Sequence, residues 1–230
     1  MIKLQESLNI LDTLKDCKSK QEVIEVSKHA FETCLYCLEA ACIIFKLEDD
    51  EYLKENFLIN AIADVEKDKE ALKEEDVLHS LKRGYFELAK YYLDHGKYLK
   101  ARDYFIRLEV IDIDDYFKSK YYLFSIACFL EEDIKEEYEL LSNTSKKEDL
   151  LKLYLPYALY LYKMSDFEGL NIILDKISTI NEKMIKILKN EISEEEKDED
   201  IDEALKVIKN NAYIINSCPH FLEYLKRSYD

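Results

Sequence analysis

The chain has 230 residues, of which 48% are hydrophobic and 36% charged, and its formal net charge is −16. This composition can bury a core, and its negative field disfavours DNA, RNA and anionic membranes as partners. The only glycines, Gly84, Gly96 and Gly169, are too far apart for a phosphate-binding loop, which excludes Rossmann dehydrogenases and P-loop ATPases.

Apolar residues recur at three- and four-residue steps along almost the whole chain, which predicts an all-α protein. About a dozen helices joined by tight turns are expected, as in stacked helical hairpins. The pattern breaks near residues 16–20, 48–50, 95–96, 112–115, 131–133, 142–145, 165–166 and 193–202.

The first expected helix, residues 1–15, is amphipathic, contains Glu6 and Asp12, and lacks the apolar core of a secretory signal. The longest apolar run, residues 40–45, is too short to cross a bilayer. We therefore expect a cytoplasmic protein. Further degenerate hairpin helices are expected at residues 23–31, 38–45 and 57–65.

Cys34 and Cys37, with His29 upstream, have a spacing that could hold zinc or form a redox disulfide. A zinc site needs four ligands, and no second pair of this kind follows in the sequence. We therefore read the six cysteines mainly as small core residues. No metal and no cofactor is expected.

The segment 85–113 contains a clear internal pattern, formed by Tyr85, Leu88, Ala89, Tyr92, Gly96, Tyr98, Ala101 and Phe105. This pattern resembles a tetratricopeptide repeat, a helical hairpin with a Gly-x-aromatic turn. The resemblance implies that Ala89 and Ala101 meet where the two helices come closest. Ile113 stands where that family usually has Pro, so the end of the second helix is assigned to the neighbouring aspartates Asp112, Asp114 and Asp115.

A weaker copy follows about 69 residues later, at Tyr154, Tyr157, Ala158, Leu161, Phe167, Leu170 and Leu174, with its turn at 165–166. A third lies between them at 121–141, with Phe124 and Ala127 in the packing positions. The resemblance therefore predicts one right-handed α-solenoid over residues 1–230. Its expected parts are degenerate hairpins (1–80), the clearest repeats (81–178) and capping helices (179–230) that include an acidic linker (193–203).

The whole chain also resembles bacterial tetratricopeptide proteins related to the suppressor-of-tumorigenicity family. The segments that carry this likeness are 22–41, the clear repeat, and 216–225, where Pro219 matches one of two prolines in that family's closing motif. No defined activity comes with this resemblance. It implies an architecture rather than a reaction.

The four histidines, His29, His79, His95 and His220, are scattered and have no nucleophile or carboxylate at a recognisable spacing. We therefore expect no catalytic residues, and His95 is assigned to the hairpin turn before Gly96. Asp198, Asp200 and Asp202 resemble the start of a calcium loop, but Glu203 and Lys209 occupy the places where that loop needs Gly and Glu. The segment is read as a solvated linker or as the acidic first turn of a helix near Ile201.

In tetratricopeptide arrays the second residue of each first helix points into a concave groove. The resemblance places three basic residues at that position: Arg83, Lys118 and Lys152. It places Lys90, Lys163, Tyr121 and Tyr162 on the same face. This would form a basic stripe that attracts an acidic peptide, although chance could also produce the recurrence. Most of the eighteen tyrosines are expected to pack between helices, and some to contact a peptide.

Together these observations predict a non-catalytic adaptor that binds a protein or peptide. Two alternatives stay open: a regulatory domain whose curvature responds to a peptide, and an all-helical enzyme. The ligand and the oligomeric state do not follow from the sequence.

Overall fold

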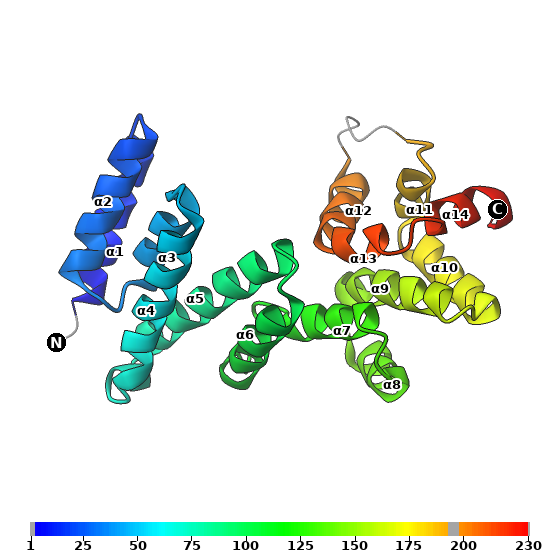
Figure 1. Cartoon of the computed structure of the whole chain (residues 1–230), viewed down its shortest axis with the longest axis horizontal. Coiled ribbons are helices and arrows are strands. Elements are labelled where there is room, and N and C mark those ends of the chain that lie inside the picture. The colour runs from blue at the N-terminus through cyan, green and yellow to red at the C-terminus, as the bar shows by residue number, and fades with distance from the viewer. Residues whose placement is uncertain (1–2, 193–197, 230) are drawn as a thin grey trace. The chain divides into compact units, whose positions relative to one another are not determined.

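The computed structural model describes residues 3–192 and 198–229 (Figure 1). Fourteen α-helices and three short 3-10 helices make up the regular structure of these residues, and none of them forms a β-strand. The prediction of an all-α chain is therefore confirmed for the described part.

Contacts within the chain divide it into two compact units, Met1–Ser119 and Lys120–Asp230. The boundary falls inside the segment 81–178 that the sequence predicts as one run of repeats. A single continuous solenoid with parts at 1–80, 81–178 and 179–230 stays a prediction.

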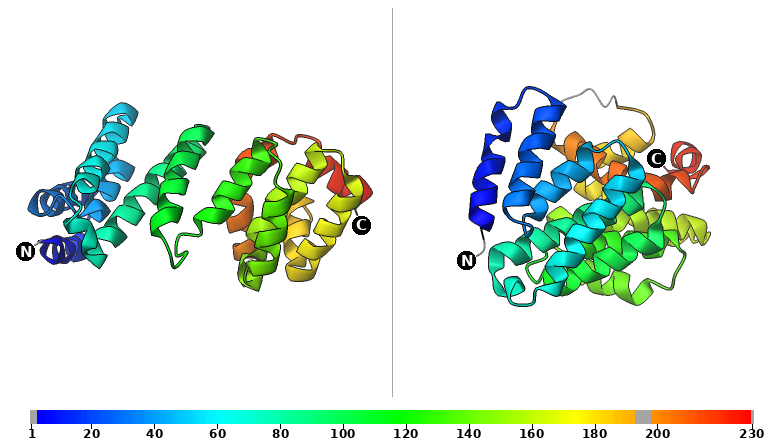
Figure 2. Two further views of the ribbon diagram at one scale, coloured as in Figure 1. Left: turned by 90° about the horizontal axis from the view of Figure 1, so that it is seen from below. Right: turned by 60° about the vertical axis from the view of Figure 1, so that its left-hand side comes forward.

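The first unit contains six α-helices that pack largely in chain order. They are α1 (Leu4–Leu11), α2 (Lys20–Thr33), α3 (Leu38–Leu47), α4 (Glu51–Lys67), α5 (Glu75–Asp94) and α6 (Tyr98–Ile111), with 3-10 turns at Asp12–Asp16 and Ala71–Lys73. Helices α1 and α2 lie side by side (Figure 2), and α3 packs against α2, α4 and α5. Side-chain caps begin two of these helices: Ser19 accepts a hydrogen bond from the amide of Glu22, and Asp50 accepts two from α4.

The hairpin of α5 and α6 has the features that the repeat pattern predicts. Ala89 and Ala101 are completely buried, and Gly96 has a φ of 69°, the left-handed conformation that ends a helix most easily with glycine. Gly84 lies where α5 crosses α3 and α4, because a Cβ there would be 3.1 Å from side-chain atoms of both Leu38 and Ile62. Small residues thus allow the close approaches of α5.

Helix α6 ends at Ile111, as expected, and Asp112 forms its C-cap. The buried Asp112 carboxylate accepts a hydrogen bond from the amide of Phe117, 2.9 Å away, and its other oxygen lies 3.3 Å from Lys82 Nζ. The turn after α6 is therefore held to α5 by a buried charge pair. Phe117 packs there against Phe86, with ring centroids 5.0 Å apart.

The second unit is centred on α9, which packs against α8, α10, α12 and α13. Its helices are α7 (Ser119–Phe129), α8 (Lys135–Thr144), α9 (Leu150–Lys163), α10 (Phe167–Ile180), α11 (Glu182–Leu188), α12 (Glu199–Asn210), α13 (Ala212–Asn216) and α14 (Phe221–Ser228), with a 3-10 turn at Lys147–Asp149. A buried polar cluster joins α7 to the α12–α13 corner. In it, Ser125 lies 2.5 Å from Asn211 Oδ1 and 2.7 Å from the Tyr213 hydroxyl.

The helix expected near Ile201 begins at Glu199, where the Asp198 side chain accepts a hydrogen bond from the amide of Asp200. The reading as an acidic first turn is therefore confirmed, although residues 193–197 of the predicted linker lie outside the described residues. The break expected at 142–145 is partly wrong, since α8 continues to Thr144. The break at 34–37 falls between the helices expected at 23–31 and 38–45, whereas the break at Asn181, before α11, was not predicted.

Candidate functional site

The basic residues of the predicted stripe are paired with carboxylates. Four of them form an ion pair with a carboxylate three or four residues away: Arg83 with Glu87 (3.1 Å), Lys90 with Asp94 (3.7 Å), Lys118 with Asp115 (3.6 Å) and Lys152 with Asp149 (2.5 Å). The fifth, Lys163, pairs with Glu131, 3.0 Å away. These carboxylates compensate the positive charge that was expected to attract an acidic ligand.

The three stripe residues also occupy different places in their helices. Arg83 is the ninth residue of α5, Lys118 precedes α7 with a φ of 57°, and Lys152 is the third residue of α9. The expectation that each is the second residue of its helix is therefore wrong. Aromatic spacing indicates which residues pack together, but it does not determine where a helix begins, and α5 extends well upstream of Tyr85.

The two tyrosines assigned to the same face contribute to the core of the second unit. Tyr121 is buried and donates a hydrogen bond to the Ser145 hydroxyl, 2.8 Å away. The half-buried ring of Tyr162 packs against Phe221 and Tyr224, with centroids 5.4 and 5.7 Å away. Burial removes the Tyr121 ring from the surface where a peptide would bind. The role of Arg83, Lys118 and Lys152 as binding residues stays a prediction.

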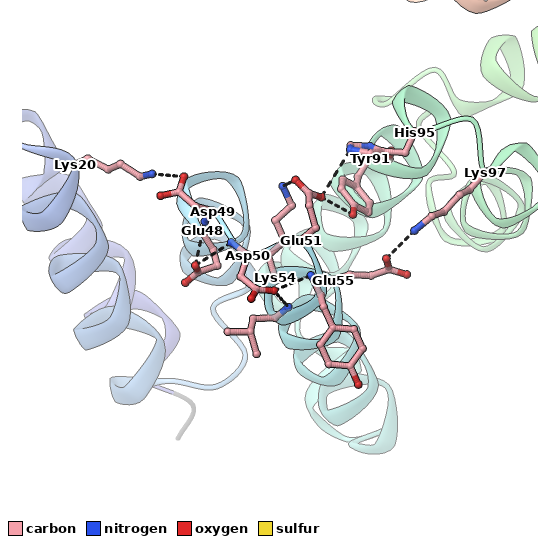
Figure 3. A network of polar contacts seen from close by, with 12 residues as sticks. Lys20, Glu48, Asp49, Asp50, Glu51, Lys54, Glu55, Tyr91, His95 and Lys97 are labelled. Atoms are coloured by element: carbon pink, nitrogen blue, oxygen red, sulfur yellow. Dashed lines mark hydrogen bonds and ion pairs between the residues drawn. The ribbon is translucent and has the colours of Figure 1, made fainter.

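Tyrosines of the first unit donate hydrogen bonds to carboxylates, a use that the sequence did not reveal. The pairs are Tyr36 with Asp68 (2.5 Å), Tyr85 with Glu66 (2.5 Å), Tyr91 with Glu51 (2.7 Å) and Tyr92 with Glu55 (2.9 Å). Glu51 and Glu55 extend from α4 toward Tyr91 and Lys97 in Figure 3. Burial, together with the hydrogen bond to Glu51, raises the pKa of Tyr91 to about 12.

Glu55 is the centre of this network. Besides the Tyr92 hydroxyl, its carboxylate accepts hydrogen bonds from Lys97 (2.8 Å) and Lys100 (3.4 Å). Desolvation by burial raises the pKa of Glu55, but the hydrogen bonds from Lys97 and Tyr92 outweigh it and leave this pKa below its ordinary value. The network therefore joins α4 to α5 and α6 through an ionised side chain.

The cysteine pair lies in the core of the first unit. Cys34 and Cys37 are buried, and desolvation raises the pKa of Cys37 to about 12, far from that of a reactive thiolate. His95 lies in the turn, as predicted, with Nδ1 2.8 Å from the carbonyl of Tyr91. Across residues 3–192 and 198–229, no group of three or more His, Cys, Asp or Glu side chains is placed to hold a metal ion.

A groove runs between α2 and α4, with α3 beneath it. It consists of three adjoining hollows of about 490, 120 and 360 Å³. The first two share Phe31 and Phe57, and the last two share Leu35 and Asp64. The three hollows are neighbours that share walls, and together they are called the α2–α4 groove, lined in part by Phe31, Leu35, Leu53, Phe57, Asn60 and Asp64.

Apolar side chains dominate the middle of the α2–α4 groove. The rings of Phe31 and Phe57 meet edge to face across it, with centroids 5.2 Å apart. Leu35, in the turn after α2, and Leu53, in the first turn of α4, are each 57% exposed. From Leu53 to Asp64, α4 is about 17 Å long, which corresponds to three helical turns.

The rim of the groove is polar and carries both signs of charge. Lys28 and Glu32 line it from α2, and Asn60 and Asp64 from α4. Sequence reasoning missed this site because Phe31 and Phe57 were assigned to packing inside degenerate hairpins. The available signal was the i, i+4 spacing of Leu53 with Phe57, which places both side chains on one side of α4.

Every helix of the described residues is too short or too polar to span a membrane. Comparisons with protein-family models, curated proteins and solved structures gave no match to this chain. The tetratricopeptide resemblance therefore rests on the repeat residues themselves.

Proposed function

We propose that this protein is a non-catalytic binding module, a right-handed tetratricopeptide-like stack of helical hairpins. Its first unit binds an amphipathic helix of a partner protein in the α2–α4 groove. The observation that carries this proposal is the row of adjoining, mainly apolar hollows between α2 and α4, with Leu53 exposed in one and Leu35 in the next.

The apolar lining provides the binding energy. Single exposed leucines are common on protein surfaces, but here Leu35 and Leu53 flank the Phe31–Phe57 ring pair in adjoining hollows. Aromatic and aliphatic side chains gathered in a groove typically form the centre of an interface, surrounded by a polar rim. Three turns of a bound helix would match the length of the groove.

The walls of the groove favour a helix over an extended peptide. Both walls are largely α-helical, and the amides and carbonyls inside α2 and α4 already bond within their own helices. An extended peptide would therefore find few partners for its backbone, whereas a helix satisfies its own backbone hydrogen bonds. The Asn60 amide, on the rim, can bond one polar group of the bound segment.

The charges on the rim suit a different ligand from the acidic peptide that was expected to bind the basic stripe. Lys28 stands near Glu32, and Asp64 lines the far end, so the groove selects neither sign of charge. Binding should depend mainly on apolar contact and change little with salt. Attraction of an acidic peptide to Arg83, Lys118 and Lys152 would weaken steeply with salt.

The experiment uses helix-constrained amphipathic peptides selected from a display library against the wild-type protein. Their affinities are then measured for Leu35→Lys, Leu53→Lys and the control Leu140→Lys, whose leucine on α8 is 63% exposed. We expect at least a tenfold loss, about 1.4 kcal/mol, for both groove variants and none for the control. Peptides that bind all three variants equally would overturn the proposal. Loss of binding when the salt concentration is raised would overturn it as well.

A further inference from the structure

Helix α6 has two apolar faces, and only one of them is covered. Ala101, Phe105 and Leu108 are completely buried. On another face, Leu99, Ile106 and Val110 are 66%, 45% and 74% exposed, and Ile113 in the following turn is 91% exposed. Within α6, Ile106 lies seven residues after Leu99 and Val110 lies four beyond Ile106, a spacing that places the three side chains in one stripe of the kind seen in paired helices.

The charged residues beside this stripe match a second copy of the same helix. Arg102 and Glu109 lie on one flank, and Asp103 and Arg107 lie on the other. If two α6 helices pair antiparallel about a two-fold axis near residue 105, Arg102 faces Glu109 of the other copy, and Asp103 faces Arg107. One axis therefore aligns both pairs with opposite charges.

A parallel pairing would have the reverse effect. In a parallel pair with Leu99 and Ile106 at equivalent heptad positions, Arg102 would approach Arg107 of the other helix, so that like charges would meet. Arg107 already bonds to Glu66, 3.2 Å away, but its guanidinium has five donors and can accept a second carboxylate partner. The charges thus favour the antiparallel arrangement alone.

We propose that α6 is a self-association surface, which pairs antiparallel with α6 of a second copy about a two-fold axis near residue 105. The occupant is a second copy because the stripe is complementary to itself in both apolar spacing and charge. One helix face on each side buries less than the roughly 1,200 Å² of a standard interface. We therefore expect a weak dimer, with a Kd on the order of 100 μM.

Sedimentation equilibrium of the full chain from about 10 μM to about 1 mM tests the proposal across this expected Kd. The apparent mass should rise toward that of a dimer in the wild type and in the control Leu140→Lys. Val110→Lys should abolish the rise, with an unchanged circular dichroism spectrum, because it places a charge in the centre of the stripe.

A charge reversal tests the antiparallel geometry itself. Glu109→Arg sets Arg against Arg102 of the other copy, and should weaken the dimer at least tenfold. Adding Arg102→Glu restores opposite charges and should restore association. A wild type that stays monomeric throughout would overturn the proposal, as would a double variant no better than Glu109→Arg. A Val110→Lys variant that lowers the melting temperature of a monomer would show that the stripe is covered within one chain, which also overturns it.

Discussion

The substitution Glu55→Gln tests whether the ionised carboxylate of Glu55 holds α4 against α5 and α6. Glu55 accepts hydrogen bonds from the Tyr92 hydroxyl, Lys97 and Lys100, and its side chain is 18% exposed. Glutamine has the same shape and keeps one acceptor oxygen, so the Tyr92 hydrogen bond can survive. The substitution removes the negative charge and one of the two acceptor oxygens.

The expected loss follows from the hydrogen bonds that depend on the charge. A hydrogen bond to a charged group contributes about 1.5 to 3 kcal/mol when it is well shielded. Solvent reaches part of the Glu55 carboxylate and screens its two lysine partners, which reduces the combined effect. We therefore expect Glu55→Gln to lower the free energy of unfolding by about 1 to 2 kcal/mol at pH 7.

The stabilisation by Glu55 should decrease as the pH falls. The pKa of Glu55 is lowered in the folded protein, while in the unfolded chain it is about 4.3. Its stabilisation is therefore fully present above the unfolded value and is lost as the pH falls toward the folded one. The difference between wild type and Glu55→Gln should be constant from pH 7 to about pH 5.5, and shrink at lower pH.

Urea unfolding followed by circular dichroism, at several pH values between 7 and 3, measures this difference. Glu70→Gln is the matched control, since its carboxylate pairs with Lys73 at 2.7 Å but is 82% exposed, and should lose less than about 0.5 kcal/mol. The reasoning is refuted if the two variants lose equal stability at pH 7. A loss for Glu55→Gln that stays undiminished at pH 3 would refute it as well.

Two further predictions concern the core. Ala89→Leu adds three carbons where no surface is exposed, so in thermal melts it should destabilise the protein by about 1 to 3 kcal/mol. The control Lys206→Leu, at an exposed position inside α12, should change the stability by less than about 0.5 kcal/mol. Equal melting temperatures would show that α5 and α6 do not meet closely at Ala89. Of the six cysteines, five are buried and Cys17 is half-buried, so Ellman's reagent should modify one thiol rapidly in the native protein and six after denaturation. Rapid modification of two or more native thiols would contradict this core.

Local spacing in the sequence was sufficient for several parts of the fold. Apolar steps of three and four predicted the helices, and Gly96 marked the turn between α5 and α6, because a left-handed residue there favours glycine. Ala89 and Ala101 were assigned to a buried crossing, and they are completely buried. Each of these features depends on residues within one hairpin, whose order along the chain already determines their contacts.

The tertiary structure alone decided how charges and tyrosines are used, because those contacts join residues far apart in the chain. Lys97 reaches Glu55 across 42 positions, and Phe31 meets Phe57 only because α2 and α4 both pack on α3. Caps and packing set the starts of helices, so Arg83 and Lys118 fell at unequal places that repeat spacing could not predict. Periodicity identifies which side of a helix is apolar, but whether that side is buried, as at Phe105, or open, as at Val110, depends on which neighbour covers it.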